Sequence, residues 1–157
     1  MWYDSSMIIE VKSTGAMQAL GAKIGDRIMG GEVIVLIGDI GAGKTTFTKG
    51  LARSMGISED VQSPTFTVSR VYETGRGVTL AHYDFYRLSD PGIMRAELME
   101  AAHDPRMATI IEWSEIVADV LPTDTLRMII TATGEDTRIV ELVPGGERSR
   151  ALIEEIA

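Results

Sequence analysis

Residues 38–46 read GDIGAGKTT and match the pattern G-x-x-x-x-G-K-[ST] without a gap. The preceding residues, 32–37, form an apolar run rich in β-branched side chains, which predicts a buried parallel strand. The residues from Lys44 to Met55 predict a helix, with Gly56 as its stop signal. A phosphate-binding loop requires this order of strand, glycine-rich loop and helix, so the sequence predicts such a loop at residues 38–46.

The predicted loop contains residue types that suit a polyphosphate and its metal ion. Gly41 and Gly43 let backbone N–H groups turn towards the phosphates and leave room for a close approach. The helix that starts at Lys44 presents further N–H groups and the positive end of its dipole to the same anion. Lys44 itself adds a mobile positive charge, and we expect it to face solvent in the nucleotide-free loop. The Thr45 hydroxyl suits Mg²⁺, and the Thr46 hydroxyl suits the α-phosphate.

Length, charge and composition restrict the class of protein. A chain of 157 residues suits one domain, which we place over residues 1–157. A formal charge of -8 argues against a stand-alone nucleic-acid-binding protein, because contacts to phosphate groups need clustered Lys and Arg. The absence of cysteine fits the reducing cytoplasm. No apolar run approaches the ~20 residues of a membrane span, and the N-terminal residues do not resemble a signal peptide.

The rest of the chain predicts alternating strands and helices around the loop. Met17, Leu20, Ile24 and Ile28 recur three or four positions apart, which predicts the buried face of a helix. We therefore expect an α/β fold of the P-loop NTPase type, with three layers and a mainly parallel sheet that carries antiparallel hairpin additions. The other predicted strands are residues 7–11, 66–72, 78–84, 108–113, 126–131 and 137–142, and the other predicted helices follow Ser13 or Thr14 and cover residues 93–102, 114–121 and 147–156.

Two of the predicted strands end on a carboxylate, at Asp84 and at Glu112. In an open α/β sheet, ligands bind beyond the carboxyl ends of the strands, so either acid can lie close to Mg²⁺. One acid can bind the metal ion directly and the other through water, although each can also be a strand-end residue that faces solvent. We expect His82 and His103 to be structural or surface residues, because neither has a metal-ligating partner at a suitable spacing.

The segment from Ser63 to Thr65 has two open interpretations. Its hydroxyl groups can form a loop that senses the γ-phosphate, as the switch segments of nucleotide hydrolases do. It can equally be an ordinary capped loop, because Pro64 biases Ser63 towards an extended conformation. Composition alone favours the ordinary loop slightly.

Four ordered blocks of the sequence, residues 38–47, 63–67, 82–88 and 112–113, closely resemble the TsaE (YjeE) family of small bacterial P-loop ATPases. The resemblance covers nearly the whole chain. It implies an ATPase that is needed for threonylcarbamoylation of the adenosine next to the anticodon in ANN-decoding tRNAs. It also implies that the chain acts with the partner proteins TsaB and TsaD, and that its contact with tRNA is indirect.

The resemblance implies a role for each matched residue. Lys44 would grip the phosphates, Thr65 would occupy a switch-like position and Trp113 would be important for activity. Ser114 stands where family members usually have proline, a departure that affects the entry into the next helix only. The implied catalytic residues are Lys44, Thr65, Asp84 and Glu112, the implied ATP-binding residues are Thr14, Gly41, Ala42, Gly43, Lys44, Thr45 and Thr46, and the implied Mg²⁺-binding residues are Thr45, Asp84 and Glu112.

Other classes of P-loop protein fit the sequence less well. A GTPase needs an N-K-x-D motif, but the chain contains no Asn and no D-x-x-G sequence. A small-molecule kinase of similar length is the stronger alternative, although it usually carries an arginine-bearing lid, and the candidates Arg87, Arg95 and Arg106 are sparse. A nucleotide-gated interaction module is a third class. It merges with the TsaE interpretation, in which ATP hydrolysis resets a complex and the partner performs the transfer.

Overall fold

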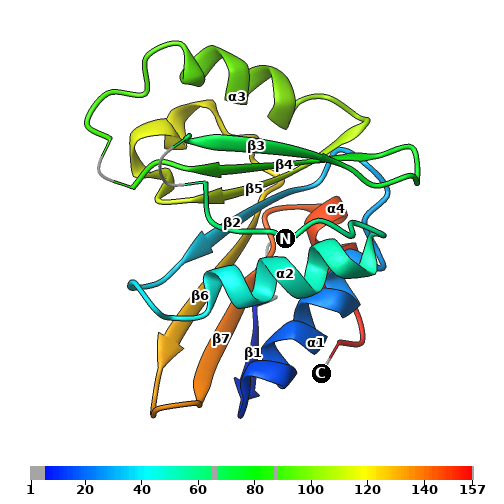
Figure 1. Ribbon diagram of the computed structural model, residues 1–157, viewed down its shortest axis with the longest axis vertical. Coiled ribbons are helices and arrows are strands. Elements are labelled where there is room, and N and C mark those ends of the chain that lie inside the picture. Colours follow the sequence, from blue (N-terminus) through cyan, green and yellow to red (C-terminus); the bar gives the residue numbers. More distant parts are fainter. Residues whose placement is uncertain (1–5, 65–66, 87, 157) are drawn as a thin grey trace.

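The computed structural model describes residues 6–64, 67–86 and 88–156, and these build a sheet covered by helices on both faces (Figure 1). The strands are β1 (Met7–Val11), β2 (Val33–Ile37), β3 (Ser69–Glu73), β4 (Thr79–Asp84), β5 (Met107–Glu112), β6 (Leu126–Ala132) and β7 (Arg138–Val143). The helices are α1 (Thr14–Gly25), α2 (Lys44–Ser54), α3 (Met94–Ala102) and α4 (Glu147–Ile153), and η1 (Ser114–Val120) is a 3-10 helix.

The seven strands follow the order β1-β7-β6-β2-β5-β4-β3 across the sheet. The four neighbours β6, β2, β5 and β4 are mutually parallel, whereas β3, β7 and β1 each join an adjacent strand in the antiparallel direction. The expected mixed, mainly parallel sheet with hairpin additions is therefore confirmed. Because parallel strands end at one edge, this arrangement gathers the ends of β2, β4 and β5 in one place.

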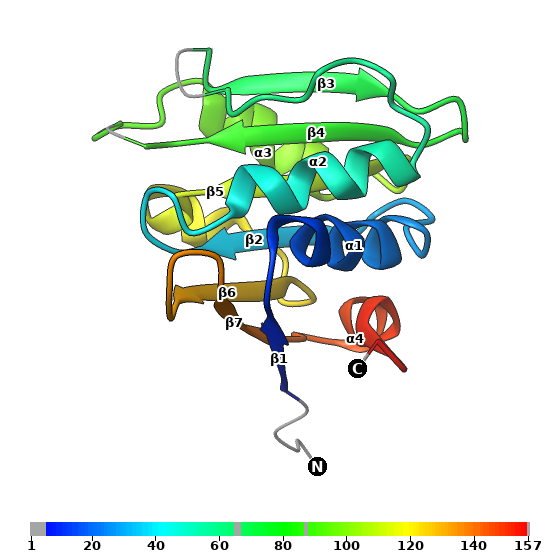
Figure 2. The ribbon, with the colours of Figure 1, turned by 60° about the horizontal axis from the view of Figure 1, so that its bottom comes forward.

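Helices cover the two faces of the sheet, and each face has its own apolar core. Figure 2 shows α1, α2 and α4 on the near side of the sheet and α3 on the far side. The core under α1, α2 and α4 includes Ile24, Phe47 and Leu152, and the core under α3 and η1 includes Leu98 and Val117. This arrangement gives the three layers that the sequence predicts.

Helices α1 and α2 pack so closely that glycine is required at their contact. A Cβ atom at Gly50 would lie 2.1 Å from the carbonyl oxygen of Gln18, and one at Gly21 would lie 2.2 Å from that of Phe47. Real Cβ atoms do not approach other atoms this closely, so a side chain at either position would push the helices apart. The glycine inside the helix that follows the phosphate loop therefore fixes that helix against α1.

Two predicted boundaries differ from the structure by three residues, and several others, such as those of β5 and β7, differ by one. Strand β3 begins at Ser69 rather than residue 66, because Val68 has a positive φ of 68° and the N–H groups of Thr67 and Val68 donate to the Pro64 carbonyl in a turn. Helix α4 ends at Ile153 rather than residue 156, because Glu155 adopts a positive φ of 57°. Phe66, the predicted start of that strand, lies outside the described residues.

Candidate phosphate-binding site

The GDIGAGKTT loop connects β2 to α2 at the edge where the parallel strands end. Leu36 of β2 pairs with Glu112 of β5, and Glu112 pairs in turn with Asp84 of β4. Paired residues point to the same face of a sheet, so both carboxylates lie on the face that carries α2. The structure thus brings the loop and the two strand-end acids together.

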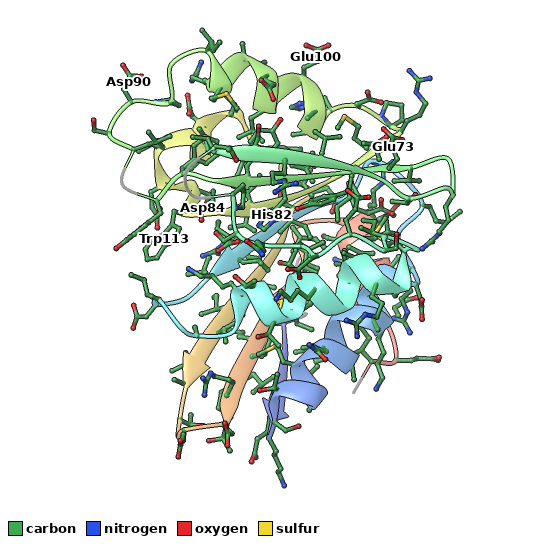
Figure 3. The ribbon with its side chains drawn as sticks, in the orientation of Figure 1. Glu73, His82, Asp84, Asp90, Glu100 and Trp113 are labelled. Atoms are coloured by element: carbon green, nitrogen blue, oxygen red, sulfur yellow. The ribbon has the colours of Figure 1, made fainter. Side chains whose placement is uncertain are left out.

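A cavity of about 350 Å³ opens between the loop and the two acids. Figure 3 shows Asp84, His82 and Trp113 gathered at this edge, whereas Glu73 lies at the opposite end of the sheet. The walls of the cavity include Gly43, Lys44, Thr45, Thr46, Asp84 and Glu112. A single space therefore contains a loop built for phosphates and two carboxylates.

The backbone of the loop requires its glycines. Gly41 has a φ of 81° and Gly43 has a φ of 114°, values that side-chain-bearing residues rarely adopt. A Cβ at Gly43 would also lie 3.2 Å from Cε of Met17. These positive φ angles turn the chain sharply just before α2, so the N-terminal N–H groups of that helix open towards the cavity.

Lys44 is buried, with 6% of its surface exposed, so the expectation that it faces solvent was wrong. Its Nζ donates to the carbonyl of Gly38 at 2.7 Å and lies 4.0 Å from the centroid of the Trp113 ring. The loop carbonyl and the aromatic ring replace water around the ammonium group. Burial lowers the pKa of Lys44, and the negative charges of Glu112 and Asp84 oppose that shift.

Asp84 is buried and does not face solvent. Its Oδ2 accepts a hydrogen bond of 2.6 Å from the Ser63 hydroxyl, and its Oδ1 accepts one of 2.9 Å from the N–H of Tyr86. The carboxylate therefore ties the loop before β3 to the loop after β4. Ser63 thus faces the site, whereas Thr65 lies outside the described residues.

Glu112 is also buried, and its Oε2 lies 2.7 Å from Nε2 of His82. His82 is fully buried, and its Nδ1 has no hydrogen-bond partner in the described part of the chain. A protonated Nδ1 would be a buried donor without an acceptor, so the contacts assign the proton to Nε2, which donates to the carboxylate. No hydrogen bond from a described residue reaches Oε1 of Glu112.

The sequence interpretation of the histidines was incomplete. His103 is an exposed residue that contacts the carbonyl of Met99, as expected. His82 is buried, as a structural residue would be, but it also contacts the carboxylate of Glu112 in the site. The signal that could have found it is the strand period of two, because His82 precedes Asp84 by two positions and therefore lies on the same face of β4.

Trp113 and Tyr86 form an aromatic wall beside the acids. Their ring centroids are 4.8 Å apart, with the planes tilted by 39°, and both side chains line the cavity. Trp113 has a positive φ of 56°, which turns the chain from β5 directly into η1 at Ser114. This turn places the indole over Lys44 rather than along the strand direction.

Two of the expected nucleotide-binding residues lie on the other side of the loop. Thr14 and Ala42 line a smaller cavity of about 80 Å³ that also contacts Gly43 and Thr46. The N–H of Ala42 donates to the carbonyl of Asp39 rather than into the main cavity. The smaller cavity is also lined by Arg138, which sequence reasoning treated as an ordinary strand residue.

The oxygen atoms around the cavity fit Mg²⁺. The Thr45 hydroxyl and the carboxylates of Asp84 and Glu112 are hard oxygen donors that line this one cavity. Among the residues that the structure describes, no cluster of three or more His, Asp or Glu could enclose a metal ion. Mg²⁺ suits such a sparse set, because it keeps several waters and binds through one or two carboxylates together with phosphate oxygens.

Comparison with known proteins places this site in a family. Residues 11–140 match the model of the family described as "Threonylcarbamoyl adenosine biosynthesis protein TsaE". The chain belongs to the TsaE family. The TsaE protein of Bacillus subtilis is 37% identical over 148 residues, covering 94% of this chain and 88% of that protein. The TsaE protein of Treponema pallidum is 39% identical over 119 residues, covering 75% of this chain and 86% of that protein.

A solved structure supports the same assignment. The crystal structure of Bacillus subtilis YdiB superposes with a TM-score of 0.81 and 29% sequence identity. The alignment covers 99% of this chain and 96% of YdiB. The TsaE match and this superposition together confirm both the family resemblance and the fold class predicted from sequence. In the described ranges, no helix combines the length and hydrophobicity that crossing a bilayer requires.

Proposed function

We propose that this chain is a Mg²⁺-dependent ATPase of the TsaE type that supports threonylcarbamoyladenosine modification of tRNA in the cytoplasm. The observation that carries the proposal is the meeting of Lys44, Asp84 and Glu112 in one cavity at the start of α2. Membership of the TsaE family supports the pathway, because the family and its relatives are named for threonylcarbamoyladenosine biosynthesis.

The residues around the cavity have different roles in ATP hydrolysis. The helix N-terminus and Lys44 bind the phosphates, and Lys44 exchanges the Gly38 carbonyl for a phosphate oxygen. Mg²⁺, when bound, neutralises charge on the phosphate oxygens. Glu112 offers Oε1 for a direct contact with the metal ion, while His82 holds Oε2. Asp84, whose two oxygens bind Ser63 and Tyr86, acts through water and through the loops that it positions.

The described lining of the cavity lacks one component of a fast phosphoryl-transfer site. None of its lining residues in the described part of the chain is an arginine. A partner can supply such a charge in trans or order a loop around the γ-phosphate, with an effect of ~10³ or more on the rate. We therefore propose slow hydrolysis by the isolated chain and a change of that rate by TsaB and TsaD. The net charge of -8 supports indirect contact with tRNA.

Steady-state ATP hydrolysis by the chain alone and with saturating TsaB and TsaD tests this function. We expect a low rate alone, a changed rate with the partners, and a weaker response to the partners in Thr65→Ala. Identical rates with and without partners, together with an unchanged response in Thr65→Ala, would contradict the coupling. That outcome would favour a small-molecule kinase instead, and phosphorylation of an acceptor would then be the activity to measure.

The contact between His82 and Glu112 leads to a prediction for the metal ion. His82→Phe should raise the Mg²⁺ concentration needed for hydrolysis by about tenfold or more, because residues that orient metal ligands contribute 10- to 100-fold to metal affinity or activity. His82→Gln retains an N–H donor and should lose less. Hydrolysis measured against Mg²⁺ concentration gives the comparison, with His103→Gln as the surface control. An unchanged Mg²⁺ requirement in His82→Phe would show that the contact with Glu112 has no functional role.

A further inference from the structure

Arg138, the first residue of β7, links the β6–β7 turn to the phosphate loop. Its Nε donates to the Ala42 carbonyl at 2.8 Å, and its Nη2 donates to the Gly41 carbonyl at 3.2 Å. Its Nη1 donates to three carbonyls of the turn, those of Gly134, Glu135 and Thr137. One planar guanidinium therefore joins two segments that are 96 positions apart in the sequence.

The direction of these hydrogen bonds determines where a loop amide points. All described peptide bonds are trans, and in a trans peptide the C=O of one residue and the N–H of the next point in opposite directions. Because Arg138 binds the Ala42 carbonyl, it turns the N–H of Gly43 away from itself. No hydrogen bond from this N–H reaches any described residue, and Gly43 lines the main cavity. The guanidinium thus holds a backbone donor ready for an anion.

Arg138 forms no ion pair with a described carboxylate, although Asp136 lines the smaller cavity beside it. The ion pairs among the described residues involve Lys49, His82, Arg95 and Arg106, and none involves Arg138. Within the described ranges, every hydrogen bond of the guanidinium goes to a carbonyl oxygen. A full positive charge therefore lies directly behind the loop, where it favours a polyphosphate on the opposite side.

We propose that Arg138 is a positioning residue that holds the phosphate loop in its anion-binding conformation before nucleotide arrives. This inference deepens the proposed function and rests on it for the identity of the anion, a nucleoside polyphosphate. Arg138 binds the outer carbonyls of the loop and does not line the main cavity, so it acts on the loop rather than on the transferred phosphoryl group. Its loss therefore weakens binding more than it slows the bound complex.

Arg138→Gln tests the proposal, with Arg127→Gln as the matched control. Arg127 lies exposed on β6 of the same hairpin, and its side chain makes no hydrogen bond or ion pair with the described residues. Calorimetric titration with ADP should give about tenfold or greater weakening in Arg138→Gln, the size of a lost charge-assisted hydrogen bond, and little change in Arg127→Gln. The kcat at saturating ATP should change less than KM.

Hydrogen exchange of the nucleotide-free protein gives a second readout that does not depend on hydrolysis. Amides of residues 40–44 should exchange faster in Arg138→Gln than in the parent, while amides of β2 and β5 should not change. If the parent binds no ADP, the proposed function fails, but the exchange comparison still decides the role of Arg138. Parent-like ADP affinity together with parent-like exchange at residues 40–44 would overturn the proposal.

Arg138→Lys separates the geometry of the contact from its charge. It also keeps the proposal testable if Arg138→Gln does not fold. A lysine retains the positive charge but has no planar fork that can bind both loop carbonyls. We expect Arg138→Lys to bind ADP weakly and to show the same faster exchange at residues 40–44. Full recovery of affinity and exchange in Arg138→Lys would show that the charge alone acts and that the loop needs no positioning.

Discussion

Lys44→Met should abolish productive ATP binding or hydrolysis while the fold survives. The ammonium group is the only lysine charge that lines the cavity in the described part of the chain, and it lies between the phosphate loop and the two acids. Methionine has a similar length and fills the same space without a charge. The variant therefore loses the contacts of Lys44 to phosphate without leaving a void. ATP hydrolysis and ADP titration measure the loss of activity and binding, and circular dichroism measures whether the fold survives.

The burial of Lys44 makes methionine a better test than alanine. Alanine would leave a gap between α2 and the Trp113 ring, and large-to-small changes at buried positions destabilise by ~2–5 kcal/mol. Activity lost through partial unfolding could then be mistaken for lost chemistry. Lys49→Met is the matched control, because Lys49 lies on the same helix and makes only a partly exposed ion pair with Asp60. Parent-level hydrolysis by Lys44→Met, with a parent-like spectrum, would remove Lys44 from the mechanism.

The lowered pKa of Lys44 also predicts how stability depends on pH. Burial disfavours the charged ammonium, so the folded protein binds this proton less tightly than the unfolded chain does. The resulting cost to stability is present below the folded pKa and is relieved as pH rises from that value towards 10.5. Lys44→Met lacks this cost, so any stability advantage that it has over the parent should shrink with rising alkaline pH.

The parts of the fold that sequence predicts are those with a local pattern. The apolar run before residue 38, the glycine-rich loop and the helix from Lys44 each repeat a signal over neighbouring residues, so their structure follows from short-range preferences. The two strand-end acids were also found locally, because each ends a predicted strand, and the apolar run before Glu112 is the more continuous one. Their meeting at one edge follows from the parallel direction of β4 and β5.

The contacts that sequence reasoning missed all span long distances in the chain. Nothing near Arg138 indicates that its guanidinium binds carbonyls 96 residues earlier, because that contact depends on how the β6–β7 hairpin folds over the loop. His82 reaches Glu112 across 30 positions. The burial of Lys44 likewise depends on Trp113, whose positive φ no residue pattern announces. Predicting such contacts requires the order of the strands in the sheet, and the local periodicity of the sequence does not give that order.

Asp84→Asn and Glu112→Gln should each reduce Mg²⁺-dependent hydrolysis by ~10² or more, because a lost metal or water contact removes several kcal/mol of transition-state stabilisation. The Asn and Gln side chains keep the size and an acceptor oxygen of the buried acids, whereas alanine would not. Asp84→Ala would leave the part-buried Ser63 hydroxyl and Tyr86 N–H without this acceptor, which adds a cost to stability that an amide at position 84 reduces. Glu73→Gln is the control, because Glu73 ends β3 at the opposite edge of the sheet (Figure 3).

The double variant decides whether the two acids act through one ion. If Glu112 binds Mg²⁺ and Asp84 acts through water on the same ion, the first loss already removes most of what the second could remove. The double variant should therefore lose far less than the product of the two single losses. The titration of hydrolysis with Mg²⁺ separates the two roles, because Glu112→Gln should raise the Mg²⁺ requirement more than Asp84→Asn. Parent-level hydrolysis in either single variant would make that acid a bystander, and fully multiplicative losses would assign the two acids to independent tasks.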